Sequence, residues 1–190
     1  MSDLHLYLVR HGRTDWNDAG RWQGSNDIPL NDTGRAQAAV LAESLVGRVD
    51  ALFASDLVRA SETARIVSER LSVPILALDA DLRERGYGVF EGLTGAECET
   101  RYPDAWAARQ GDRNTVPPGG EPHAHVVARM ESAMQRIVHT MRERGGRALV
   151  VGHGSSLRMF LERITSRSQP GLANLELREV AHDGERFRAL

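Results

Sequence analysis

The chain has 190 residues, of which 24 are basic and 26 acidic, and 41% of its residues are hydrophobic. This length fits one domain over residues 1–190, and the near-neutral charge gives no indication of nucleic-acid binding or disorder. The sequence lacks a secretory pattern and a segment of membrane-spanning length, so we expect a cytoplasmic enzyme with no membrane partner. Cys98 is the only cysteine, which excludes an internal disulfide.

All 24 basic residues are arginines, because the sequence contains no lysine. Mechanisms that use a Schiff-base lysine or the lysine of a P-loop are therefore excluded. Any anion site must use arginine, histidine or backbone amides, and the planar guanidinium group suits phosphate and carboxylate.

Short apolar runs alternate with helical patterns along the chain. Long polar or glycine-rich loops are expected at 12–30 and at 83–95. Strands are predicted at 4–9, 51–54, 74–78 and 148–151, with a C-terminal hairpin that turns at Asp183 and Gly184.

Amphipathic helices are expected between these strands. The first covers 31–45 and is capped by Asn31, and the second begins at a cap formed by Ser55 or Asp56. The last begins at Ser155 or Ser156. A longer helix after the stretch at 117–120 places one apolar stripe in the core: Val127, Met130, Met134, Ile137 and Met141.

Strands that alternate with such helices are typical of an α/β fold with a mainly parallel sheet covered on both faces, and ligands bind beyond the carboxyl ends of the strands. Arg10 and His11 end the first predicted strand, and His153 follows the last parallel one. Arg59 lies one helical turn after the second strand, and Glu84 lies in the loop after the third. These five residues are expected to converge, and together they can hold, attack and protonate a phosphate monoester.

Taken singly, each of these residues has a structural alternative. A lone histidine after a strand is more often structural than catalytic. Arg59 would equally serve as a surface partner of Glu62 or Glu43, and Glu84 would equally be one more solvated charge between two arginines. The strand, histidine and glycine pattern recurs near both ends of the chain. This favours function, because Gly12 and Gly154 would let a ligand approach the backbone.

Four separated motifs in this order resemble the histidine phosphatase superfamily, which includes the cofactor-dependent phosphoglycerate mutases. The resemblance spans nearly the whole chain. The motifs are Val9-Arg10-His11-Gly12 with Thr14 and Asn17, Ser55-Asp56-Leu57 with Arg59, Ala60 and Glu62-Thr63-Ala64, Leu82-Arg83-Glu84 with Gly88 and Glu91-Gly92, and Gly152-His153-Gly154.

The resemblance implies a three-layer α/β/α sandwich with a mixed, mainly parallel sheet. It also implies that His11 becomes phosphorylated, that Arg10, Arg59 and His153 bind the phosphoryl oxygens, and that Glu84 donates the proton. Asn17, the backbone near Gly24, and Gly154 would contact the substrate, a small organic phosphate ester, with no metal and no cofactor. The expected enzyme is a metal-independent phosphomonoesterase with a phosphohistidine intermediate.

Two departures from the family pattern bear on the substrate. Arg13 stands where the family often has Glu. Two interpretations have equal support: Arg13 recruits a second anionic group of the substrate, or it is a solvated loop residue. The region 93–118 is shorter than in true mutases, and its arginines are scattered, which favours hydrolysis over a phosphoglycerate mutase reaction. Pro122 follows Gly119-Gly120-Glu121 where the family has Ser, a change expected to affect helix capping only.

Other readings of the sequence are weaker. A cysteine phosphatase needs an arginine where Asp104 stands, and a metal-dependent phosphatase built on Asp79 and Asp81 would lack its lysine. His123 and His125 have no evident carboxylate partners for a metal. A non-catalytic anion-binding module of the same fold is the remaining alternative. The sequence predicts neither the physiological substrate nor the oligomeric state.

Overall fold

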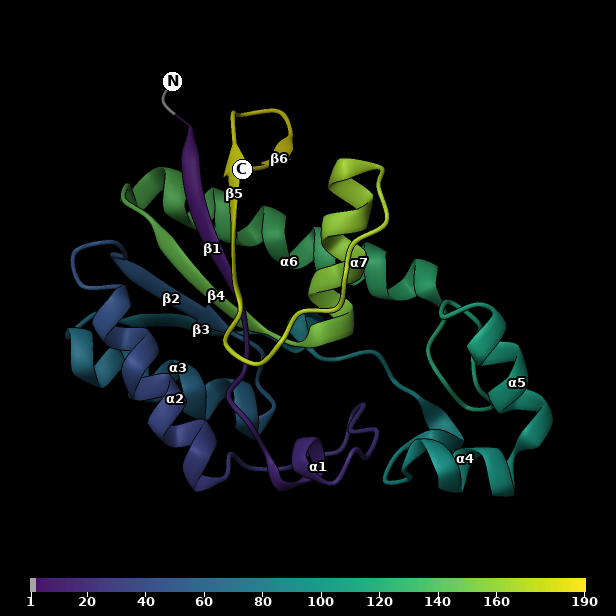
Figure 1. The fold of residues 1–190 in the computed structure, drawn as a ribbon. Coiled ribbons are helices and arrows are strands. Elements are labelled where there is room, and N and C mark those ends of the chain that lie inside the picture. The colour runs from purple at the N-terminus through teal and green to yellow at the C-terminus, as the bar shows by residue number, and fades with distance from the viewer. Residues whose placement is uncertain (1–2) are drawn as a thin grey trace.

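One six-stranded sheet, in the order β3-β2-β4-β1-β5-β6, runs through the computed structural model, which describes residues 3–190 (Figure 1). The strands are β1 (Leu4–Arg10), β2 (Ala51–Ala54), β3 (Ile75–Leu78), β4 (Ala148–Gly152), β5 (Leu177–His182) and β6 (Phe187–Ala189). The first four pair in parallel, whereas β5 and β6 are antiparallel to their neighbours. The predicted mixed, mainly parallel sheet is confirmed.

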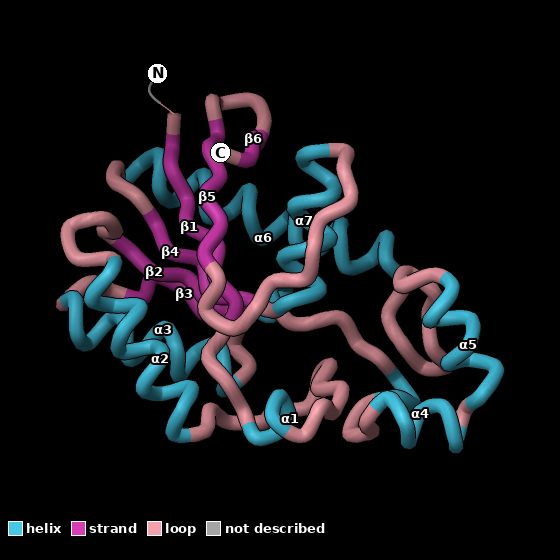
Figure 2. The backbone as a smooth tube through the Cα atoms, in the orientation of Figure 1, coloured by secondary structure: helices cyan, strands magenta, loops and turns pink. Residues whose placement is uncertain are grey.

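Helices cover both faces of this sheet and also gather beyond one end of it (Figure 2). The helices are α1 (Asp15–Asp18), α2 (Asp32–Ser44), α3 (Val58–Leu71), α4 (Gly95–Arg101), α5 (Pro103–Gly111), α6 (His123–Arg144) and α7 (Gly154–Thr165), with 3₁₀ turns η1 (Ala80–Leu82) and η2 (Gly88–Phe90). The sandwich of α2 and α3, the sheet, and α6 and α7 confirms the predicted three layers.

Strand β1 shows why the sheet is buried on both faces. Leu6 and Leu8 point to one side and pack with the apolar stripe of α6, whereas Tyr7 and Val9 point to the other side and pack with α2 and α3. A strand with both faces covered is apolar at successive positions, as in the parallel strands of α/β proteins. The predicted stripe of α6 is confirmed, since all five of its residues are buried: Val127, Met130, Met134, Ile137 and Met141.

The predicted cap of α3 is wrong. The helix begins at Val58 with Leu57 as its N-cap and without a side-chain capping bond. The Ser55 hydroxyl does accept the Leu57 amide, at 3.3 Å. The Asp56 carboxylate instead receives two hydrogen bonds from Arg83, at 2.7 and 2.6 Å, so an ion pair to a distant loop replaces the local cap.

The start of α7 also differs from the prediction. The helix begins at Gly154, with His153 as N-cap, rather than at Ser155 or Ser156. The amides of both serines donate to the Glu84 carboxylate, each at 3.0 Å. A side chain about 70 residues away therefore satisfies amides that a local cap would otherwise bind.

The region predicted as a loop at 12–30 contains the short helix α1. The Thr14 hydroxyl accepts the Asn17 amide, and the Asn17 side chain accepts the Thr14 amide, which makes a capping box. Helices α4 and α5 extend away from the sheet (Figure 1) and pack on a small separate cluster built around Tyr87, Phe90 and Cys98.

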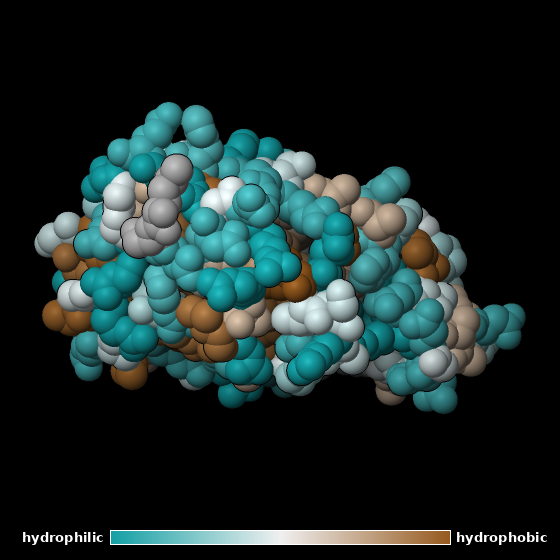
Figure 3. Space-filling view, turned by 90° about the horizontal axis from the view of Figure 1, so that it is seen from above, coloured by the Kyte–Doolittle hydropathy of each residue, from teal (hydrophilic) through white to brown (hydrophobic). Residues whose placement is uncertain are grey.

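The surface carries mainly polar side chains. The face seen in Figure 3 is mostly hydrophilic, with scattered hydrophobic residues. Among residues 3–190, no helix combines the length and the hydrophobicity needed to span a membrane.

Candidate active site

The carboxyl ends of β1 and β4 bring His11 and His153 together. The two strands are in register, with Arg10 opposite Gly152, and the His11 amide donates to the Gly152 carbonyl at 3.0 Å. The two imidazole rings lie 5.2 Å apart between centroids. The sheet therefore fixes both histidines by backbone pairing, as expected for neighbouring parallel strands.

The hydrogen bonds of His11 select one tautomer. Its Nδ1 lies 2.7 Å from the Gly12 carbonyl oxygen, which can only accept, so Nδ1 carries the proton. The other nitrogen, Nε2, therefore holds the free lone pair. Burial, aided by the charges of Arg59 and Arg10, holds the pKa of His11 well below its usual value. The imidazole is neutral near pH 7, which is the form that can attack phosphorus.

His153 has the opposite tautomer. Arg59 Nε donates to His153 Nδ1 at 3.2 Å, so the proton of the neutral ring lies on Nε2. That Nε2 is buried and has no hydrogen-bond partner within residues 3–190. Burial, followed by the charge of Arg59, keeps the pKa of His153 well below its usual value. His153 therefore offers a neutral N–H donor beside the neutral ring of His11.

Arg59 is fully buried, which excludes the alternative of a surface partner for Glu62 or Glu43. Besides contacting His153, its guanidinium donates to the carbonyls of Asn26, at 2.6 Å, and Gly24, at 2.8 Å. Burial lowers the pKa of Arg59 to about 10, so the side chain is still charged at neutral pH. Arg59 connects the loop after α1 to His153, which follows β4.

Arg10 is held by the segment that leads into β5. Its guanidinium donates to the Leu172 carbonyl at 2.8 Å, and Nε is buried without a partner within the described chain. The Asn174 amide group donates to the His11 carbonyl at 2.9 Å. Burial lowers the pKa of Arg10, although Glu84 acts in the opposite direction.

Glu84 is fixed by three backbone amides. In addition to Ser155 and Ser156 at the start of α7, Arg85 donates its amide to the same carboxylate at 2.8 Å. The positive end of the helix dipole favours a carboxylate here. Tyr87 lines the same cavity as Glu84, and its hydroxyl is hydrogen-bonded to Ser155 Oγ. Burial raises the pKa of Tyr87 to about 12, so it is a neutral hydroxyl.

These residues surround a cavity of about 280 Å³, a size at the lower end of ligand pockets. The residues predicted from the sequence that line it are Arg10, His11, Asn17, Gly24, Arg59, Glu84 and Gly154. His153 is not among the lining residues, but its ring adjoins that of His11, which is one of them. Arg13 is not among the lining residues, and its guanidinium pairs with Asp18, which favours the solvated-loop alternative.

The two glycines that follow the histidines differ in their surroundings. A Cβ on Gly12 would lie 2.6 Å from the Gly34 carbonyl oxygen of α2, so Gly12 makes room for another part of the protein rather than for a ligand. Gly154 lines the cavity, where a Cβ would lie 3.4 Å from Arg10 Nε. Gly24 has a φ of +52°, and a Cβ there would overlap the Glu91 carboxylate at 2.0 Å. Only glycine fits at this position, so backbone atoms line the cavity there.

Several lining residues were not predicted from the sequence. They are Gly20, Arg21, Gln23, Tyr87, Ser155, Arg158, Gly171 and Leu172. Arg158 has a signal that could have been used, since it follows the Gly152-His153-Gly154 motif by one helical turn and so shares a face with Gly154. Gly171 and Leu172 have no such signal, because only the antiparallel pairing of β5 brings them here.

The alternatives that use a metal gain no support. Within residues 3–190, no group of three or more His, Cys, Asp or Glu side chains is placed to hold an ion. Asp79 and Asp81, the pair considered for a metal-dependent phosphatase, both bind Arg136 at 2.7 Å.

The sequence matches the model of the histidine phosphatase superfamily (branch 1) over residues 6–189. The chain belongs to the histidine phosphatase superfamily. This confirms the family that the four motifs predicted.

Relatives and solved structures agree with this assignment. The chain is 37% identical to a metal-independent phosphoserine phosphatase of Arabidopsis thaliana, over 87% of this chain and 71% of the relative. It is 36% identical to a 2,3-bisphosphoglycerate-dependent phosphoglycerate mutase of Methylobacterium, over 88% and 85% of the two chains. A mycobacterial glucosyl-3-phosphoglycerate phosphatase solved with VO3 superposes with a TM-score of 0.87 at 30% identity, covering 98% and 97%. The predicted phosphomonoesterase class, with mutases as the runner-up, is confirmed.

Proposed function

We propose that this chain hydrolyses small organic phosphate monoesters through a phosphohistidine formed at His11 Nε2. The observation that carries the proposal is the hydrogen bond from His11 Nδ1–H to the Gly12 carbonyl, which leaves Nε2 unprotonated in a buried site. Relatives named as phosphatases support the reaction class. The small cavity favours a small-molecule ester over nucleic acid or a membrane lipid as the partner.

In the proposed reaction, Nε2 attacks phosphorus while the P–O bond to the alcohol breaks on the opposite side. Arg10, Arg59 and the Nε2–H of His153 compensate the charge on the phosphoryl oxygens. In the complex with substrate, the negative charge of the phosphate opposes the carboxylate form that the amides and the helix dipole favour, and Glu84 donates a proton to the leaving alkoxide. The resulting carboxylate then takes a proton from water, whose oxygen attacks the phosphohistidine and releases phosphate.

The mutase reaction is the second candidate, because a bisphosphoglycerate-dependent mutase is among the relatives. It requires that a second hydroxyl, rather than water, receives the phosphoryl group from His11. The short segment between Gly92 and Gly119 favours water.

The test is to trap the intermediate with a ³²P-labelled ester in the presence of a chelator. We expect acid-labile, base-stable label on the wild-type protein and steady release of phosphate. His11→Ala should give neither, whereas His139→Ala, on the exposed surface of α6, should give both. Hydrolysis that survives in His11→Ala, or that disappears with the chelator, would overturn the proposal. Isomerisation of 3-phosphoglycerate with a bisphosphoglycerate primer would favour the mutase.

A further inference from the structure

Arg158 of α7 is a buried arginine that faces the cavity without a role in the reaction above. Its side chain is only 5% exposed, yet it is one of the residues that line the cavity, on the same face of α7 as Gly154 and Ser155. Burying a guanidinium is costly unless its donors are used. Of its donors, Nη1 binds Glu162 Oε2 at 2.6 Å. Within residues 3–190, no hydrogen bond is found for Nε or Nη2.

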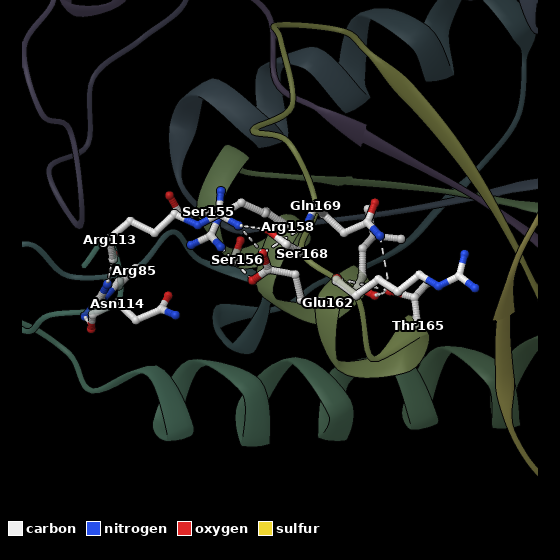
Figure 4. Close-up of polar contacts among 12 residues, drawn as sticks. Arg85, Arg113, Asn114, Ser155, Ser156, Arg158, Glu162, Thr165, Ser168 and Gln169 are labelled. Carbon is white, nitrogen blue, oxygen red and sulfur yellow. Dashed lines mark hydrogen bonds and ion pairs between the residues drawn. The ribbon is translucent and has the colours of Figure 1, made fainter. Parts of the chain in front are cut away.

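A fixed carboxylate determines where the Arg158 guanidinium lies (Figure 4). Glu162, one helical turn further along α7, accepts from Arg158 on one oxygen. Its other oxygen accepts from Arg113 and from the Gln169 amide. Because Arg113 and the Gln169 backbone amide hold Glu162, Glu162 in turn holds Arg158, and the remaining donors of Arg158 form a preorganised edge.

The surroundings of Arg158 carry an excess of positive charge. Arg113 and Arg158 share the single carboxylate of Glu162. Arg85 is fully buried and donates only to carbonyls, and burial followed by the charge of Arg158 lowers its pKa. Arg109 has a buried Nε without a partner in the described chain. A second anion in this part of the cavity would offset that excess.

We propose that Arg158 is the specificity-determining residue of the cavity and binds a carboxylate carried by the organic part of the phosphate ester. The inference rests on the proposed function, since it concerns the substrate of the same site. A planar carboxylate matches the two free donors on one edge of a guanidinium. Arg10, Arg59 and His153 bind the phosphoryl group, so the two anionic ends of the substrate are separated across the cavity.

The experiment compares 3-phosphoglycerate with glycerol 3-phosphate, which differ in a carboxylate against a hydroxymethyl group. We expect wild-type kcat/KM to favour 3-phosphoglycerate about 10- to 100-fold, the range that one charge-assisted pair gives. Arg158→Leu should bring the ratio of the two kcat/KM values to about 1, and Arg158→Lys should restore part of it. Arg163→Leu, on the exposed face of α7, is the matched control and should keep the wild-type ratio.

The ratio is measured within one preparation, so loss of folded protein lowers both rates together and leaves it unchanged. Equal kcat/KM values for the two esters in the wild type, or an unchanged ratio in Arg158→Leu, would overturn the inference. Hydrolysis of both esters in that case would still support the proposed function. If the wild type hydrolysed neither ester nor p-nitrophenyl phosphate, the proposed function would fail, and the inference with it.

Glu162 acts through Arg158 and is a positioning residue. Glu162→Gln should raise KM for 3-phosphoglycerate several-fold more than KM for glycerol 3-phosphate, with the ratio of the two kcat values retained. An equal rise in both KM values would show a structural role only and would contradict the positioning role.

Discussion

At the scale of single residues, the site depends on which nitrogen of each histidine carries a proton. Gly12 fixes this for His11 and Arg59 fixes it for His153, so one ring offers a lone pair and the other a donor. A guanidinium is needed for the second task, because Arg59 donates to His153 and to two loop carbonyls at the same time. A single ammonium cannot reproduce that planar arrangement.

Arg59→Lys is therefore expected to lower kcat/KM for p-nitrophenyl phosphate by at least about 100-fold, the effect typical of removing one preorganised donor to a transferring group. Arg65→Lys, on the same helix but exposed and paired with Glu69, is the matched control. Similar activity in the two variants would show that charge alone, without the guanidinium geometry, is sufficient.

At the scale of elements, Arg85 connects the loop after η1 to the segment that precedes α6. Its guanidinium donates to four backbone carbonyls, those of Arg113, Asn114, Thr115 and Glu121. Figure 4 labels Arg85 together with Arg113 and Asn114. These bonds hold a stretch without regular secondary structure against the core, beside the amide that fixes Glu84.

Arg85→Met is expected to reduce the free energy of unfolding by about 3 kcal/mol or more, since each buried carbonyl left without a donor costs roughly 1–3 kcal/mol. Limited proteolysis should then cut within residues 112–121. Arg101→Met, at an exposed position of α4, provides the comparison. Unchanged cleavage and an unchanged melting temperature would contradict this role for Arg85.

The sequence predicted these elements well where the pattern was local. The apolar run at β1 and the stripe of α6 follow from side-chain periodicity alone. Arg10, His11 and His153 were expected at one edge because each lies at the carboxyl end of a predicted parallel strand. The sequence-based prediction failed where a residue distant in the chain determines the local structure. The start of α7 depends on Glu84, and buried arginines such as Arg85 and Arg158 resemble surface charges until their acceptors are known.

At the scale of the whole molecule, two buried neutral histidines couple stability to pH. The pKa values of His11 and His153 are both lowered in the folded state, mainly by burial, so below about pH 6.5 the unfolded chain binds more protons than the folded chain. Stability therefore falls as the pH drops below this value, by up to about 1.4 kcal/mol per pH unit for each group.

We expect His153→Asn to have a shallower loss of stability between pH 6.5 and pH 5 than the wild type, by about one proton in the linkage slope. The measurement is urea unfolding at a series of pH values, and the exposed His139→Asn controls for the substitution itself. Parallel curves for the wild type and His153→Asn would show that His153 is protonated in the folded state over this range.

The contacts of Arg10 and His11 with Leu172 and Asn174 span 162 and 163 residues of chain. During synthesis, at roughly 5–20 residues per second, about 8 to 32 s separate the appearance of His11 from that of the residues that hold it. A nascent chain on the ribosome thus carries His11 long before it has a binding site. The site can assemble only after residues 172–174 have been synthesised.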